Sequence, residues 1–240
     1  MSNSASNFPT LTDALRMDLL GLSPPSIHPH ETMPAHYSGV PLSEAESALI
    51  LLHGRGATAE SIEPLSHHLG LPKNCAVICP QAANNTWYPH SFMAPRQDNE
   101  PYLTSALMVI QRVLSEVLAQ GLTEDRIILS GFSQGACLAS EVVARLSQPI
   151  GGLLAFSGGV IGQDIDPELQ RKGEPLSGMP VFLGCSDIDM HIPEERVHDT
   201  ASLLQRLGAT VDCQIYPGMA HTIIADELER ASLLLSKRLT

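Results

Sequence analysis

Short apolar runs alternate with amphipathic stretches along the chain from about residue 45 onward. The apolar runs predict strands at residues 48–52, 76–79, 126–129, 152–156, 181–183 and 211–215. Between them, apolar residues recur at helical spacing, which predicts helices at residues 60–69, 103–119, 136–146, 194–207 and 223–239. Strands that alternate with helices of this length are typical of parallel pairing. We therefore predict an α/β fold with a mostly parallel central sheet and helices on both faces.

Residues 1–45 differ in composition from this pattern, with many Ser, Pro and His residues. We predict a partly ordered arm that packs over the domain or over a neighbouring molecule, and a folded domain over residues 46–240. Thr12 is a candidate cap for a short helix that ends near Leu20. A metal site from His28, His30 and His36 is the alternative, but no Cys or carboxylate stands beside them at ligand spacing. We expect no metal.

Composition and charge exclude several classes of protein. A chain of 240 residues fits one ordinary domain, and its formal net charge of −12 argues against a nucleic-acid or anionic membrane surface. The apolar run at residues 48–52 is far shorter than the roughly 20 residues that span a bilayer, so we expect no membrane insertion. The charge also disfavours anionic substrates at long range, although Arg55 or Arg96 would offset this locally.

The five cysteines are odd in number and show no regular framework of spacings. The first residues lack the positively charged region and apolar core of a secretory signal. Both observations predict a cytoplasmic protein.

The segment GFSQG at residues 131–135 lies between a predicted strand and a predicted helix. The pattern G-x-S-x-G in that context predicts a nucleophile elbow, a turn sharp enough to lift the hydroxyl of Ser133 clear of the sheet. Gly131 and Gly135 are needed because side chains there would collide across the turn. The following helix directs its first N–H groups at the site, where negative charge develops during acyl transfer.

A serine hydroxyl needs a base, and three histidines follow Ser133: His191, His198 and His221. His198 falls inside a predicted helix, whereas His221 stands in a loop after a predicted strand, where ligands meet open α/β sheets. We therefore predict His221 as the base. The partner acid comes from the loop after the strand at 181–183, which holds both Asp187 and Asp189.

Three segments together, LLHGRGA at 51–57, GFSQG at 131–135 and YPGMAH at 216–221, resemble the phospholipase/carboxylesterase family of α/β-hydrolases. That family includes acyl-protein thioesterases and bacterial esterases, and the resemblance covers about residues 45–240. It implies an α/β-hydrolase fold and ester hydrolysis through a Ser-His-Asp triad, without metal or organic cofactor.

The family acid commonly stands in a G-x-x-D-P-x-V-P pattern. Counting forward from Gly184 gives Asp187, and counting back from Pro193 gives Asp189. Met190 stands where the family has Pro. We favour Asp189 because its spacing into the following helix is kept, and Asp187 is the alternative.

The resemblance also implies that the backbone N–H groups of Arg55 and Gln134 form the oxyanion hole. It places the loop that holds Trp87 beside the acyl pocket, so Trp87 is a candidate substrate contact. The other interpretation is that Trp87 caps the core under a long loop.

We expect a serine hydrolase that cleaves small-molecule carboxylic esters with small to medium acyl chains. A thioesterase or lysophospholipase acting on longer chains is the alternative. A dienelactone-type hydrolase is weaker, since its nucleophile would normally be Cys. From another class, a non-catalytic binding protein of the same fold is the rival. The arm and the apolar helices also predict a homodimer.

Overall fold

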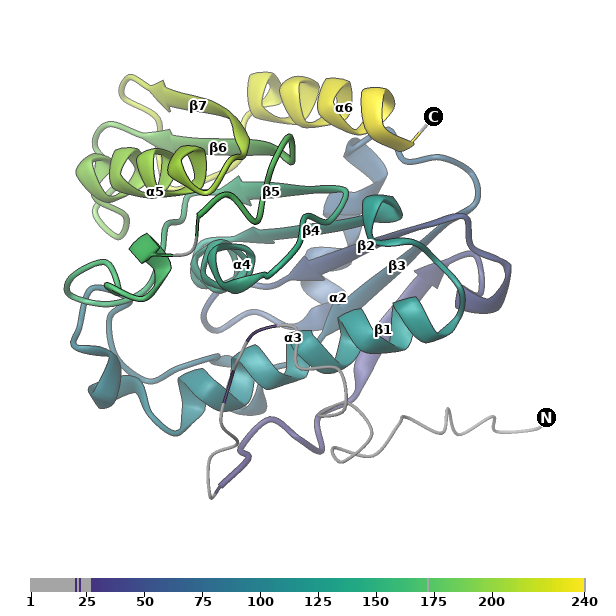
Figure 1. Ribbon diagram of the computed structural model, residues 1–240, viewed down its shortest axis with the longest axis horizontal. Helices are drawn as coiled ribbons and strands as arrows, with labels where there is room; N and C mark the ends of the chain where they lie inside the picture. The colour runs from purple at the N-terminus through teal and green to yellow at the C-terminus, as the bar shows by residue number, and fades with distance from the viewer. Residues whose placement is uncertain (1–19, 21, 23–26, 172, 240) are drawn as a thin grey trace.

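A seven-stranded sheet forms the centre of the computed structural model, which describes residues 20, 22, 27–171 and 173–239 (Figure 1). Its strands follow the order β1-β3-β2-β4-β5-β6-β7. Their bounds are β1 Ala35–Gly39, β2 Ser47–Leu52, β3 Cys75–Pro80, β4 Ile127–Phe132, β5 Gly152–Phe156, β6 Pro180–Ser186 and β7 Thr210–Tyr216. Only the pair β1·β3 is antiparallel among these neighbours. The predicted mostly parallel α/β sheet is confirmed.

Helices cover both faces of the sheet (Figure 1). The helices are α2 Ala59–Ile62, α3 Tyr102–Ala119, α4 Gln134–Arg145, α5 Glu194–Arg206 and α6 Ala225–Leu239. Apolar residues of α3, α4 and α5 pack in one core cluster, and those of α2 and α6 pack in a second cluster on the other face. Every residue of β2, β3 and β5 is buried, which explains why these strands are runs of apolar residues without alternation.

The helix predicted at residues 60–69 is shorter in the structure than the sequence pattern suggested. α2 stops at Ile62, and a 3-10 helix continues over Glu63–His68. Pro64 explains the change, because it lacks the N–H that would donate to the carbonyl of Glu60 and its ring collides with that turn.

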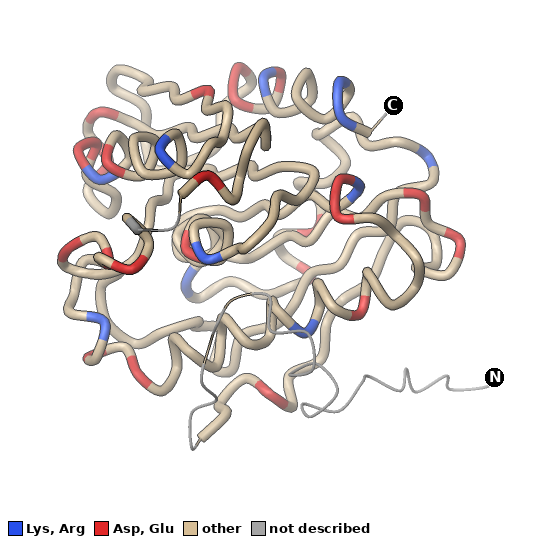
Figure 2. Tube along the Cα trace, in the orientation of Figure 1, with Lys and Arg blue, Asp and Glu red and all other residues tan. Residues whose placement is uncertain are grey.

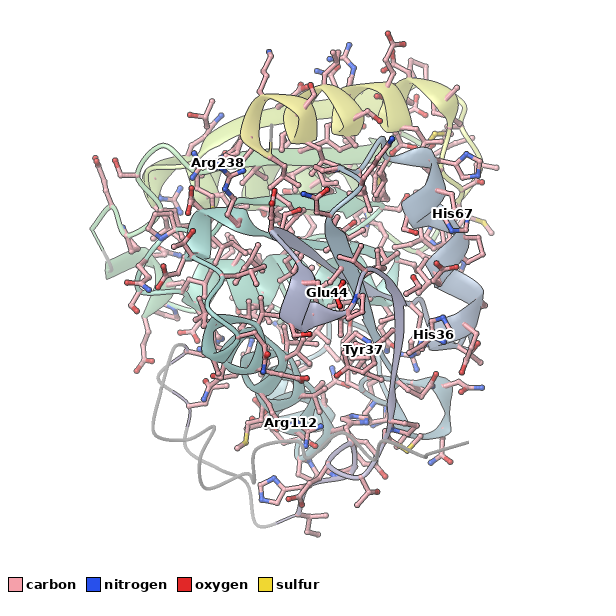
Figure 3. The ribbon with its side chains drawn as sticks, turned by 90° about the vertical axis from the view of Figure 1, so that its right-hand side faces the viewer. His36, Tyr37, Glu44, His67, Arg112 and Arg238 are labelled. Carbon is pink, nitrogen blue, oxygen red and sulfur yellow. The ribbon has the colours of Figure 1, made fainter. Side chains whose placement is uncertain are left out.

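Strand β1 lies within the segment that we predicted to be an arm, so the sheet begins before residue 46. Its edge is visible in Figure 3, where His36 and Tyr37 are labelled. The hydroxyl of Tyr37 lies 3.2 Å from both carboxylate oxygens of Glu116 on α3, which ties the edge strand to a helix. The helix considered after Thr12 lies almost wholly outside the described residues.

His30 has a structural role that the sequence did not indicate. It is fully buried, its Nε2 lies 2.9 Å from the carbonyl oxygen of Trp87, and its Nδ1 accepts a hydrogen bond from the amide of Ala83 at 3.0 Å. Both ring nitrogens are therefore engaged by backbone groups. Among the described residues, no group of three or more His, Cys, Asp or Glu side chains has the arrangement of a metal site.

Helix α3 is long and apolar enough to cross a membrane by length and composition alone, but 67% of it is buried inside the protein. It packs against the sheet with α4, as Figure 1 shows. Its apolarity is that of a core helix.

Candidate active site

Ser133 occupies a sharp turn between strand β4 and helix α4. Its backbone has φ 56° and ψ −120°, a region that residues with a side chain rarely adopt. The amide of Ser133 donates to the carbonyl of Phe156 on β5 at 2.9 Å, and its own carbonyl accepts from the amide of Cys137 at 3.0 Å. The strained turn is thus held from both sides, as a nucleophile elbow requires.

The two glycines of the GFSQG segment are required by close backbone approach. A Cβ atom on Gly131 would lie 2.5 Å from the carbonyl carbon and oxygen of Gly135. One on Gly135 would lie 2.2 Å from the carbonyl oxygen of Leu52 on β2. The sequence predicted that side chains at these two positions would collide across the turn. Gly135 is needed for a second reason, because its missing side chain lets α4 pack close to β2.

His221 lies on the loop between β7 and α6 and contacts Ser133. Its Nε2 is 2.9 Å from the Oγ of Ser133, and its Nδ1 is 2.6 Å from Oδ2 of Asp189. The carboxylate favours the tautomer with the proton on Nδ1, which leaves Nε2 as an acceptor for the serine hydroxyl. The three side chains therefore form a continuous chain of hydrogen bonds.

The side chain of Asp189 is inaccessible to solvent, and its second oxygen accepts from the amides of His191 at 2.8 Å and Ile192 at 3.1 Å. Burial opposes ionisation of this carboxyl. Hydrogen bonds from His221 and the two amides outweigh that cost, so the pKa of Asp189 lies below its ordinary value. Asp189 is therefore held as a carboxylate beside the imidazole.

Asp187, the alternative acid, has a different hydrogen-bond partner. It is exposed, and its Oδ1 accepts a hydrogen bond from the amide of Gly218 at 2.7 Å. Asp187 thereby connects the loop after β6 with the loop that bears His221. The structure brings Asp189, rather than Asp187, to the imidazole.

Arg55 and Gln134, whose amides the resemblance implied as oxyanion donors, line the same cavity as Ser133. Gln134 is the first residue of α4, so its N–H has no acceptor within the helix. Among the described residues, no backbone carbonyl outside the helices and strands accepts a hydrogen bond from either amide. Both amides therefore stay candidates for donors to an oxyanion.

Trp87 lies behind the cavity wall rather than in it. It is fully buried and is not among the residues that line the cavity, so the structure does not bring this candidate substrate contact to the cavity. Its indole N–H donates to the carbonyl of His53 at 2.9 Å, and the two rings stack at 5.0 Å. Its amide donates to the side chain of Gln134 at 2.9 Å. Trp87 thus braces the loop, which is the other interpretation that the sequence left open.

The cavity has a volume of about 720 Å³ and opens over Ser133. Its wall includes apolar groups from four separate segments, Ile62, Phe92, Phe132 and Met190. Tyr88, which is part of the loop of Trp87, lines the cavity. The sequence did not single out His90 and His191 as lining residues, although His90 directly follows that loop. Their orientation depends on how that loop folds over α4, which no local pattern encodes.

Glu227, in the first turn of α6, supports the loop of His221 from inside the protein. It is fully buried, and one carboxylate oxygen accepts from the amide of Ile224 at 2.9 Å. Its other oxygen has no partner among the described residues. Burial, partly offset by the Ile224 amide, raises the pKa of Glu227 from its ordinary 4.5 to about 7.

We expect the substitution Glu227→Gln to stabilise the protein relative to wild type at pH 8 but not at pH 5. Between pH 4.5 and 7 the folded state keeps a proton on Glu227 that the unfolded chain releases, so this carboxyl makes folding less favourable as pH rises. Urea denaturation of both proteins at the two pH values measures the effect. Glu229→Gln, an exposed position on the same helix, is the control and should show no such dependence. An equal Glu227→Gln effect at both pH values would contradict this interpretation.

The chain is similar to one known protein family and to several proteins of known sequence or structure. A family model described as phospholipase/carboxylesterase matches residues 40–239. A phospholipase/carboxylesterase of known structure from Dyadobacter fermentans is 40% identical with a TM-score of 0.83, covering 88% of this chain and 100% of that one. Acyl-protein thioesterase 1 of Debaryomyces hansenii is 27% identical over 84% of this chain and 95% of its own. A probable carboxylesterase of Arabidopsis thaliana is 23% identical over 82% and 80%.

Proposed function

Because the chain belongs to the phospholipase/carboxylesterase family of α/β-hydrolases, we propose that it hydrolyses carboxylic esters through an acyl-enzyme intermediate. The observation that carries this proposal is the chain of hydrogen bonds from Ser133 through His221 to Asp189, at the floor of an open cavity. A hydroxyl 2.9 Å from an imidazole acceptor has the arrangement of an activated nucleophile.

In the proposed reaction, Ser133 Oγ attacks the acyl carbon while His221 Nε2 takes its proton. The carbonyl oxygen becomes an oxyanion that accepts hydrogen bonds from the amides of Arg55 and Gln134. The imidazolium, stabilised by Asp189, then gives the proton to the leaving oxygen as the ester bond breaks. Water next attacks the acyl-enzyme with His221 again as the base. Each step uses only groups of this chain and water.

The size of the cavity supports small to medium acyl chains. A volume of about 720 Å³ with apolar walls lies within the range of sites for small organic ligands. An acyl thioesterase acting on longer chains is the second candidate, favoured by relatives named acyl-protein thioesterase 1, two of which align over more than four fifths of this chain. The same three side chains serve both reactions, since the leaving atom does not change the base or the nucleophile.

Turnover of 4-nitrophenyl acetate, butyrate, octanoate and palmitate, together with palmitoyl and butyryl thioesters, tests the proposal. We expect kcat/KM to be highest for butyrate or octanoate and at least about tenfold lower for palmitate, since several methylenes would lie outside the apolar wall. A maximum on the palmitoyl thioester would instead establish the thioesterase. A serine-directed phosphonate probe covers the remaining case: a binding protein without an activated Ser133 would not be labelled.

A further inference from the structure

The ionisable groups that face the cavity are all bases or neutral acids. Arg55, His90, His191 and His221 line it, and no Asp or Glu does so among the described residues. Asp189 stands behind His221 with its side chain inaccessible to solvent. This contrasts with the whole protein, which carries a net charge of −12 and whose carboxylates are spread over the outer helices and loops (Figure 2).

Two weak acids line the same cavity, and both are protonated at neutral pH. Burial raises the pKa of the Cys137 thiol to about 12. Burial likewise raises the pKa of the Tyr88 phenol well above 10. Neither contributes negative charge, so the cavity carries the positive charge of Arg55 without an opposing anion on its wall.

The guanidinium of Arg55 is held in place by groups that do not neutralise it. It donates to the carbonyl oxygens of Pro89 at 2.9 Å and His90 at 2.6 Å, and its Cζ lies 5.9 Å from the centre of the Tyr88 ring. A guanidinium has five N–H donors in a planar fork, so donors remain for a ligand. No acidic side chain forms an ion pair with Arg55 in the part of the chain that the structure describes.

Arg96, the other cation considered from the sequence, has a different environment. Its guanidinium pairs with the buried carboxylate of Glu141 at 2.5 Å and it does not line the cavity. The charge of Arg96 is therefore offset within the protein. Among the described arginines and lysines, Arg55 is the one that lines the cavity, and no carboxylate on the cavity wall offsets its charge.

We propose that the cavity selects esters that carry a carboxylate group, which the side chain of Arg55 binds. In the proposed reaction the amide of Arg55 donates to the oxyanion, so that carboxylate would lie within one side-chain length of the ester bond. The substrate class is then a half-ester of a dicarboxylic acid or an ester of an acidic alcohol or phenol. A planar fork held in advance loses little freedom on binding a planar carboxylate, which favours a paired hydrogen bond. The other lining side chains His90 and His191 place no negative charge nearby. This inference rests on the proposed ester hydrolysis.

Pairs of esters that differ only in charge test the inference. Monomethyl glutarate and the methyl ester of glutaramic acid place a carboxylate or an isosteric amide on the acyl side. The pair 4-acetoxybenzoate and 4-acetoxybenzamide does so on the leaving group. Hydrolysis followed by pH-stat or by phenol release gives kcat/KM for each. We expect the carboxylate to be preferred in at least one pair by about tenfold, the scale of one charge-assisted hydrogen bond.

Arg55→Gln keeps the backbone amide and removes the charge, so the preference should fall by about tenfold while the amide esters lose much less. Arg206→Gln is the matched control: it changes the net charge equally at an exposed position on α5, and should leave the preference unchanged. Arg55→Lys should restore part of the preference, because it keeps the charge but lacks the fork.

The outcomes separate this inference from the proposed function. Two results would overturn the role of Arg55 and leave the proposed esterase activity intact. In the first, the amide esters are hydrolysed and neither carboxylate ester is preferred. In the second, the preference for the carboxylate survives Arg55→Gln. If neither these esters nor the 4-nitrophenyl series is hydrolysed, the proposed function itself fails and the inference fails with it.

Discussion

Replacing Ser133 with alanine is expected to lower kcat for 4-nitrophenyl butyrate by about 10⁴- to 10⁶-fold, because the acyl-enzyme can no longer form. The residual rate would come from binding and from the amides of Arg55 and Gln134 acting on an attacking water. Alanine meets the same backbone strain at φ 56° as serine does, so the fold should be retained. Steady-state kinetics and labelling by the phosphonate probe measure the loss.

Ser140 provides the control for this experiment. It lies on α4, the helix that follows Ser133; its hydroxyl is buried and has no partner in the described part of the chain. Ser140→Ala should therefore retain activity and labelling. Equal melting temperatures for the three proteins would exclude a loss through unfolding. If Ser133→Ala kept more than about 1% of wild-type kcat, against the loss typical of a missing nucleophile, the serine mechanism would be refuted.

Asp189→Asn is expected to lower kcat by about 10⁴-fold. The amide removes the charge that stabilises the imidazolium. It also presents an NH₂ group to Nδ1 of His221, so the imidazole adopts the tautomer with its proton on Nε2, where it cannot accept from Ser133. The buried position of Asp189 strengthens both effects, since water cannot replace the carboxylate.

Asp187→Asn is the matched substitution two residues away. Its remaining carbonyl oxygen can still accept from the amide of Gly218, so kcat should stay within about tenfold of wild type, as expected when a neutral hydrogen bond replaces a charged one. Measured side by side, the two variants decide which carboxylate acts on His221. A large loss in Asp187→Asn with near-normal kinetics in Asp189→Asn would reverse the assignment.

The sequence alone was sufficient for features that depend on contiguous residues. Runs of apolar residues predicted the parallel strands, because strands buried on both faces need no polar positions. The GFSQG segment predicted the turn at Ser133, since two glycines around a serine, between a strand and a helix, have few other uses. His221 followed from its place after a strand, because the carboxyl ends of parallel strands meet at one edge of the sheet.

Tertiary structure decided the questions that depend on how separate segments pack. Asp187 and Asp189 stand in the same loop, and only the direction in which each carboxylate points brings Asp189 to His221. Trp87 was expected at the cavity, but the side chain of Gln134 on α4 and the carbonyl of His53 hold it behind the wall. Likewise, Arg55 keeps an unpaired charge only because the loop after Tyr88 offers it carbonyls rather than a carboxylate. A local pattern specifies which residues are near in sequence, whereas burial, pairing and reach depend on contacts between residues far apart in the chain.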